Sequence, residues 1–446
     1  MEIRAVSAPP LIAIDRLRKS LRLLCGQPSH PGQRADLVAT SDLVATLLRS
    51  LRMQVAVVPT ESAPVVIGRR SGRAPTTLLL YHHYDVAPPG PWRAWSHEPY
   101  QLAERDDAFY GRGVAHGKGP LVAHIEALYA LLQAEGELPC GVVVVAEGAA
   151  LLGSLNLASA IDERRGLLAA EYCLGSAGDR DAEGRPFCYS GSKGMLQVRL
   201  SVRGLAYPLA SGLATSVRNP IWRLISALTN IKGDDEDIKI SGFYDAVEGP
   251  TREENVQLRQ LSLDERGRHL AWQTREFLFG LRGAALLRAE VTLPTCNLSA
   301  ISSEPTSDLP TLPASASALL EFQLVPNQQP AAILELLREY LHMQGFEDVL
   351  VEPLLGGYPP VRSVGDQLLA AQLATVGAAV YDQPLSVLQL GPFAQPLSLF
   401  ASALGSSVAA IGLADYTSAI RGPDEHIELD HLLRHGQILI ELMKHL

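Results

Sequence analysis

The chain has 446 residues, of which 47% are hydrophobic and 19% are charged. This length exceeds one compact core and predicts two or three domains with a sizeable buried interior, which excludes a disordered chain. The formal net charge of −10 argues against a surface for nucleic acid or for an anionic membrane.

The cysteines and the apolar segments indicate the compartment. The five cysteines are scattered and never form a C-x-x-C pair, which excludes a disulfide framework and a cysteine-based zinc site and favours a reducing compartment. The first twenty residues lack the apolar stretch of a signal peptide. The apolar segment 141–161 is interrupted by Glu147-Gly148 and Gly153-Ser154, so it does not read as a membrane span. The sequence therefore predicts a cytoplasmic protein.

The first part of the chain alternates predicted strands and helices. Helical spacing of apolar residues marks 11–53, with a break near Gly26. Short strands are expected at 55–58 and 65–68. The runs 77–81 and 141–146 are apolar without alternation, as in strands that are buried on both faces, and a helix is expected between them at 119–133. Strand, helix, strand in this order predicts a mostly parallel sheet with helices on both faces.

The pattern changes after Lys193. Alternating strands are expected at 195–203 and 316–324, and helices at 220–231 and 330–343. This order favours a small α+β domain with an antiparallel sheet.

From about Pro359 the first pattern returns. A helix is expected at 366–376, a buried strand at 408–413 and a further helix near 429–442. We therefore expect an α/β fold in which residues 1–195 and 358–446 form one domain and residues 196–357 form an inserted α+β domain.

Potential chemistry gathers where the predicted strands end. His82, His83 and Asp85 follow the first buried strand, and ligands of open α/β sheets bind at the carboxyl ends of strands. A histidine with an aspartate two residues on is either a metal ligand with its orienting carboxylate or a hydrogen-bonded pair that fixes a loop. Glu147 ends the second buried strand and is a further candidate carboxylate.

Two loops carry further candidates. His116 and Lys118 are expected to be exposed in the glycine-rich loop 111–119, which departs from the phosphate-loop pattern G-x-x-x-x-G-K-[ST] at its last position. Arg421 and the run 423–426 precede the last predicted helix. The acidic residues of this run fit a helix N-cap with an acidic first turn.

Several motifs along the chain together resemble the M20 metallopeptidases, in particular the dipeptidase and carnosinase-like branch. The resemblance is carried, in chain order, by HYDVAP at 83–88, YGRGVAHGKG at 110–119, EGAALLGS at 147–154, NPIW at 219–222, GFYDAV at 242–247, PTCN at 294–297, LVPNQQP at 324–330 and PDEH at 423–426. It implies the layout of that family, a catalytic domain with two zinc ions that is split by a lid domain, which commonly mediates dimerisation.

Within this resemblance most of the chemical positions are substituted. The first zinc-binding histidine matches His83, and its orienting aspartate matches Asp85. The bridging aspartate falls at His116 and the late histidine at Arg421. The remaining positions are a glutamate pair that supplies a ligand and the general base, a third carboxylate ligand and three substrate contacts, which fall at Ala150, Leu151, Ala177, Ala210, Gln323 and Ala394.

These substitutions leave three hypotheses, and whether the chain is an enzyme stays open. The first is a non-hydrolysing protein of this fold with a ligand-binding, regulatory or scaffold role, without zinc or another cofactor. The second is a metal-independent enzyme for acyl transfer, condensation or cyclisation, in which His83 and Asp85 form the base and its orienter and Lys118 and Arg421 stabilise an anion. The third is a residual zinc amidase or dipeptidase with one metal ion on His83 and His116.

Further expectations concern contacts and partners. Asn219 and Tyr416 are candidate substrate contacts. The resemblance implies a homodimer through the lid domain, or a heterodimer with an active paralogue. The expected ligand is small and resembles an amino acid or a peptide, and no nucleic-acid or membrane partner is expected.

Overall fold

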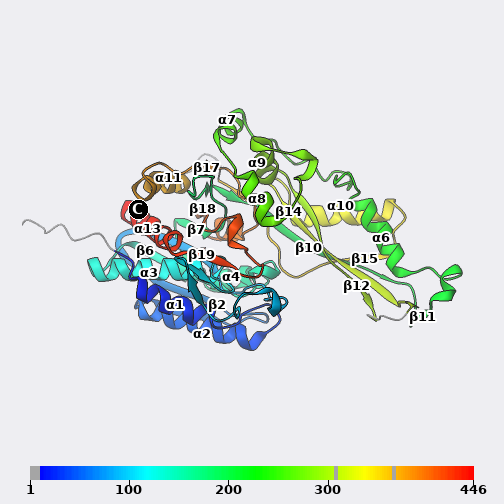
Figure 1. Ribbon diagram of the computed structural model, residues 1–446, viewed down its shortest axis with the longest axis horizontal. Helices are drawn as coiled ribbons and strands as arrows, with labels where there is room; N and C mark the ends of the chain where they lie inside the picture. The colour runs from blue at the N-terminus through cyan, green and yellow to red at the C-terminus, as the bar shows by residue number, and fades with distance from the viewer. Residues whose placement is uncertain (1–10, 306–309, 364–367) are drawn as a thin grey trace, which may run out of the picture.

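The computed structural model describes residues 11–305, 310–363 and 368–446. Figure 1 shows a body that contains both the blue N-terminal and the red C-terminal parts of the chain, and a lid domain that extends away from it. None of the helices within these residues is long and apolar enough to cross a membrane.

The body is built on one eight-stranded sheet in the order β1-β2-β6-β3-β7-β18-β8-β17. The central strands β6, β3, β7 and β18 run parallel to one another. The pair β1 and β2 extends the sheet in antiparallel fashion at β6, and β8 pairs antiparallel with β18. This mostly parallel sheet confirms the predicted fold class. The bounds are β1 Gln54–Val58, β2 Val65–Arg70, β3 Gly72–His83, β6 Leu138–Glu147, β7 Tyr172–Ser176, β8 Cys188–Tyr189, β17 Val387–Leu388 and β18 Ser407–Ile411.

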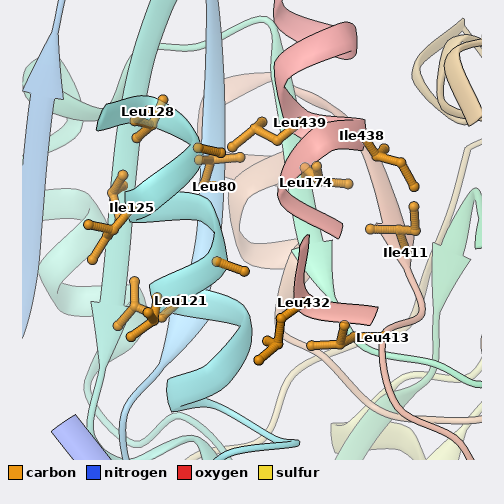
Figure 2. Close-up of a cluster of buried hydrophobic side chains, with 14 of the residues drawn as sticks. Leu80, Leu121, Ile125, Leu128, Leu174, Ile411, Leu413, Leu432, Ile438 and Leu439 are labelled. Carbon is orange, nitrogen blue, oxygen red and sulfur yellow. The ribbon is translucent and has the colours of Figure 1, made fainter. Parts of the chain in front are cut away.

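Helices cover both faces of this sheet. Along β3, Leu78 and Leu80 pack into one core and Leu79 and Tyr81 into another, which explains why this strand reads as a continuous apolar run. In Figure 2, Leu121, Ile125 and Leu128 of α3 lie beside Leu80. The first core is covered by α1 (Ile14–Cys25), α2 (Arg34–Ser50), α3 (Lys118–Glu135), α11 (Leu368–Tyr381) and α13 (Leu429–His445), and the second by α4 (Leu157–Glu163), α5 (Arg165–Leu168) and α12 (Leu397–Leu404).

Most predicted elements of the body are present. The predicted helix at 366–376 corresponds to α11, although its first two residues lie outside the described residues, as do the first ten residues of the chain. Smaller elements complete the body: the three-stranded sheet β19-β5-β4 and the pair β16-β9, with bounds β4 Ala103–Arg105, β5 Ala108–Tyr110, β19 His426–Glu428, β9 Gly191–Ser192 and β16 Val361–Arg362.

The lid domain is an antiparallel sheet with helices on one face. Its strand order is β12-β14-β10-β15, and its predicted strands and helices are confirmed. Alternate residues of β14, from Ala316 to Leu324, are buried against the helices. The bounds are β10 Gly194–Arg203, β12 Thr295–Glu304, β14 Ser315–Leu324, β15 Val349–Pro353, α6 Pro220–Ile231 and α10 Pro330–Met343, and a short pair joins β11 Leu209–Ala210 to β13 Thr311–Leu312. The exact domain boundaries at 195 and 357 stay a prediction.

Three helices that the sequence pattern does not predict lie between α6 and β12. They are α7 (Arg252–Gln260), α8 (Glu265–Trp272) and α9 (Gly283–Thr292), and residues 252–292 are called the lid insert below. Leu258, Leu287 and Val291 of the lid insert belong to the second core of the body. The buried Arg268 joins Asp179 of the body at 2.6 Å and Glu290 at 2.8 Å. In Figure 1 the lid insert therefore lies over the junction of body and lid.

Candidate functional site

The candidate site lies where the central strands of the body end. β3 and β6 are parallel neighbours, and their register places His83 opposite Glu147. The two side chains are 7% and 1% exposed. This carboxyl edge of the sheet is where open α/β sheets bind ligands, as expected from the sequence.

His83 and Asp85 form the hydrogen-bonded pair that both interpretations of the sequence require. The Nδ1 atom of His83 lies 3.1 Å from Oδ1 of Asp85 and 2.9 Å from its backbone oxygen, and the Leu151 N–H donates to Oδ2. Burial alone would lower the pKa of His83, but the hydrogen bond and charge of Asp85 outweigh it and raise the pKa above its ordinary value. Because Asp85 engages Nδ1, the Nε2 atom of His83 can bind another group. A catalytic role for the His83–Asp85 pair stays a prediction.

The glycine-rich loop brings a second imidazole to His83. The rings of His83 and His116 meet edge to face with centroids 4.6 Å apart. Gly117 has a φ of +89°, and a Cβ atom there would lie 2.9 Å from Cε1 of His83, so only glycine lets the loop come this close. Burial and the neighbouring charges of His83 and Arg421 lower the pKa of His116 well below its ordinary value, which keeps this ring neutral.

Arg421 supplies a cation whose charge reaches this site. Its charge acts on His116 and on the buried Tyr358. Arg421 is exposed, and its side chain has no hydrogen bond or ion pair with the residues that the structure describes. The backbone is fixed, because Arg112 donates to the carbonyl oxygen of Arg421 at 3.1 Å. The site thus presents a guanidinium without an acidic partner.

Glu147 is held by two hydroxyl groups that sequence reasoning missed. Tyr81 and Ser154 donate to Oε1 of Glu147 at 2.6 and 2.8 Å. Burial raises the pKa of Glu147 to about 7, although these hydrogen bonds act in the opposite direction. Tyr81 could have been found, since it lies two residues before His83 and therefore on the same face of the strand.

Lys118 does not lie where the sequence suggested. The expectation that it is exposed is wrong, because its side chain is fully buried and donates from Nζ to the backbone oxygen of Gln27 at 2.5 Å. Burial lowers the pKa of Lys118 to about 8. The ammonium group therefore ties the start of α3 to the segment after α1. His116, two residues earlier, is only partly buried.

Glu425 also differs from the expectation. It does not cap the last helix but accepts hydrogen bonds from the backbone N–H groups of Gly113, Ala115 and His116 at 3.0, 3.1 and 3.3 Å. Its other oxygen lies 2.7 Å from the buried Arg112. Glu425 therefore fixes the loop that carries His116, through partners that are remote in sequence.

The two predicted substrate contacts are engaged elsewhere. The Asn219 side chain caps α6 by accepting from the Ile221 N–H at 2.9 Å. The Tyr416 hydroxyl donates to Asp264 of the lid, which raises the pKa of Tyr416 to about 12. A role for either residue in binding a substrate stays a prediction.

The positions at which the sequence resemblance predicts substitutions are spread over both domains. Ala150 and Leu151 form a 3-10 turn after β6, and Ala177 follows β7, so these three lie at the carboxyl edge. Ala394 forms an isolated β-bridge with Lys193, next to the start of the lid. Ala210 and Gln323 lie on lid strands, and Gln323 donates to Glu321.

An α/β body that is interrupted by an antiparallel lid, with a His–Asp pair at the sheet edge, defines the class of two-domain metallopeptidase folds. The model of peptidase family M20/M25/M40 matches residues 79–445. The chain therefore belongs to this family, and the resemblance seen in the sequence is confirmed.

Relatives and solved structures agree with this assignment. A cysteinylglycine-S-conjugate dipeptidase of Corynebacterium striatum is 34% identical over 45% of this chain and 46% of its own length. A human Beta-Ala-His dipeptidase is 26% identical over 70% of this chain and 64% of its own. The match thus spans about half to two thirds of these relatives.

Among solved structures, the crystal structure of an M20 family metallo-carboxypeptidase from Sulfolobus solfataricus has a TM-score of 0.87 and 28% identity, and covers 96% of this chain and 99% of its own. Human carnosine dipeptidase 1 has a TM-score of 0.84 and 21% identity over 96% of each chain, which shows the shared fold.

The family assignment corrects one expectation. We expected no cofactor and considered zinc unlikely, and this is wrong, because members of the family are typically zinc-dependent metallopeptidases. Within the described residues no group of three or more His, Cys, Asp or Glu side chains could hold a metal ion. The hydrogen bond between His83 and Asp85 is the arrangement in which a carboxylate orients a metal-binding histidine.

Proposed function

We propose that this M20-family chain binds an amino-acid- or peptide-like anion at the carboxyl edge and does not perform the two-metal hydrolysis of its family there. One observation carries the proposal: the charge of the exposed Arg421 guanidinium acts on His116, and this guanidinium has no acidic partner among the described residues. A guanidinium recognises a carboxylate through two parallel hydrogen bonds. The carboxylate of an amino acid or a peptide is therefore its natural partner.

The residues around Arg421 support a binding role. Hydrolysis of an amide needs an activated water and a base that takes its proton. Ala150, Leu151 and Ala177 have no atom that could act as a base or as a ligand. The carboxylates Asp85 and Glu147 are held by His83 and by two hydroxyl groups, and Glu425 is held by Arg112 and by backbone N–H groups.

The lid supports an oligomeric form of this binding protein. Trp222 of α6 is 68% exposed, and Leu298 and Ile301 are 43% and 50% exposed on β12, which is an edge strand. Exposed apolar side chains beside an open strand edge favour association. We propose a homodimer through the lid, or a heterodimer with an active paralogue.

A second candidate function is catalysis on the same class of ligand by the His83–Asp85 pair. The hydrogen bond between them gives the ring a fixed orientation, as a general acid or base requires. Under this alternative, exchange of His83 abolishes turnover and leaves binding of the ligand intact.

The test uses β-alanyl-histidine and its C-terminal amide, with calorimetry for binding and chromatography for cleavage. We expect the dipeptide to bind, with at least a tenfold loss of affinity for the amide and a similar loss in Arg421→Gln. Arg288→Gln is the control, because Arg288 is an exposed arginine on α9, and it should bind like the unchanged chain. Cleavage that requires added zinc and disappears in His83→Ala would contradict the proposal and support a residual hydrolase.

A further inference from the structure

The lid insert exposes large apolar side chains at the end of α8 and in the segment before α9. They are between 49% and 71% exposed: Leu270, Trp272, Leu278 and Phe279. The segment forms a closed loop, because Glu265 accepts a hydrogen bond from the Gly283 N–H at 2.5 Å. Within this loop the rings of Trp272 and Phe277 meet edge to face. Exposed apolar side chains that gather in one place mark interaction sites.

Three arginines give the same loop a positive charge. Arg266, Arg275 and Arg282 are exposed, and their side chains have no hydrogen bond or ion pair with the residues that the structure describes. Of the acidic residues at 264–282 only Glu276 is exposed. The four apolar side chains and these three arginines are called the lid-insert patch below. A partner of this patch should combine acidic and apolar side chains.

The chain itself carries such a partner in the lid, directly after α6. Residues 232–248 contain six acidic residues and two lysines, a net charge of −4. Each lysine pairs with an acidic residue of this segment, which leaves four exposed acidic residues without a lysine partner: Asp234, Asp237, Asp245 and Glu248. Tyr244, which is 39% exposed, adds an aromatic ring. Residues 232–248 are called the acidic segment below.

We propose that the lid-insert patch of one copy of this chain binds the acidic segment of a second copy. Both surfaces are exposed in a single chain, so neither covers the other within it. The carboxylates pair with the arginines, and Tyr244 packs against the apolar side chains. Each copy carries both surfaces, so the contact forms twice in a twofold dimer.

The charge of the chain favours this partner over an anionic membrane. A membrane surface would face one whole side of a chain with a net charge of −10, whereas the acidic segment meets only the patch. The proposed contact does not involve Arg421 or the exposed side chains of α6 and β12.

The test measures self-association of the full chain by analytical ultracentrifugation. All proteins carry Trp222→Glu, so that the exposed face of α6 and β12 does not contribute. We expect dimers with a dissociation constant below about 100 µM. Association should weaken at least tenfold when salt rises from about 0.05 M to about 0.5 M, because the contact pairs opposite charges. If Trp222→Glu is monomeric and the unchanged chain associates, the proposal is overturned and the dimer through α6 and β12 stands.

Two charge-reversed variants decide whether these two surfaces meet. The patch variant carries Arg266→Glu, Arg275→Glu and Arg282→Glu. The segment variant carries Asp234→Lys, Asp237→Lys and Asp245→Lys. Each variant alone should associate at least tenfold more weakly, because its reversed surface meets a surface of like charge. An equal mixture of the two should regain association, because each reversed surface then meets one of opposite charge.

A third variant controls for the change in net charge. Arg22→Glu, Arg49→Glu and Arg93→Glu together reverse three exposed arginines of the body, and this variant should associate like its parent. An equal loss in this control or no recovery in the mixture would overturn the proposal. Binding of the chain to phosphatidylserine vesicles in place of self-association would also overturn it and would assign the patch to a membrane.

Discussion

β3 ends in two adjacent histidines, His82 and His83, whose pKa values shift in opposite directions. His83 lies at the carboxyl edge beside Asp85, whose hydrogen bond and charge overcome burial and raise the pKa of His83. His82 points to the opposite face, where its Nε2 atom lies 3.0 Å from Nδ1 of His124. The ring of His124 stacks on His435 with centroids 4.6 Å apart, and Nε2 of His435 lies 3.2 Å from the Ser176 hydroxyl.

Among the described residues the second cluster contains no carboxylate, and the pKa values of its histidines are lowered. Burial first, and then the neighbouring rings, lower the pKa of His82 well below its ordinary value, and burial lowers the pKa of His124 to about 3. The pKa values of His83 and His82 therefore shift in opposite directions, because His83 has an acidic partner and His82 has only imidazole neighbours. The partner, and not burial, decides the charge.

The largest expected effect concerns the His83 side of this comparison, where Glu425 fixes the loop that carries His116. Glu425→Ala leaves the buried Arg112 without its partner and frees three backbone N–H groups, so we expect the free energy of unfolding to fall by about 3–5 kcal/mol. Urea unfolding measures this loss. Glu428→Ala, at an exposed position of the same segment, should cost no more than about 1 kcal/mol. Equal losses in the two variants would show that Glu425 does not hold the loop.

An intermediate effect tests the cluster of His82, His124 and His435. The pKa of His435 is lowered in the folded chain, so below the ordinary histidine pKa the unfolded chain binds a proton that the folded chain does not. The free energy of unfolding therefore falls as the pH falls. His435→Phe removes this contribution and should reduce the loss between pH 7 and pH 5 by about 2 kcal/mol. His342→Phe, at a 74% exposed side chain, is the control and should leave the pH dependence unchanged.

The smallest effect sharpens the comparison at His83 itself. Asp85→Asn removes the charge that raises the pKa of His83 and leaves burial, so the pKa of His83 should fall below its ordinary value. Nuclear magnetic resonance of the imidazole groups during a pH titration measures the change. The resonances of His124 provide an internal control, because this ring should remain neutral to about pH 3 in both proteins. A His83 pKa that does not move would mean that Asp85 is not its determining partner.

The sequence predicted the elements whose patterns are set by local burial. The strand at 141–146 lies within β6, which is buried throughout, and the alternation at 316–324 appears in β14. The hydrogen-bonded pair of His83 and Asp85 was visible because its members are two residues apart. The family was visible because its motifs keep their order along the chain.

The rest depended on contacts between remote segments. α7 carries alternating charges and polar residues, and it is placed by Leu258 in the core of the body, so no local pattern marks it strongly. Glu425 binds backbone groups more than 300 residues earlier, which no side-chain pattern records. We expected Lys118 to be exposed because lysine side chains usually are. The segment around Gln27, which is remote in sequence, covers its ammonium group and accepts its hydrogen bond.

The long sequence separation between Glu425 and its loop affects the order in which the molecule is completed during synthesis. The lid strands come from one continuous part of the chain, 194–353, and can pair as soon as that part has left the ribosome. The loop at 113–116 and Arg112 are synthesised earlier, but their hydrogen bonds to Glu425 cannot form until residue 425 has been added to the chain. The lid can therefore be assembled on the ribosome while the carboxyl edge of the body is still unfinished, and this edge cannot be completed before residue 425 has emerged.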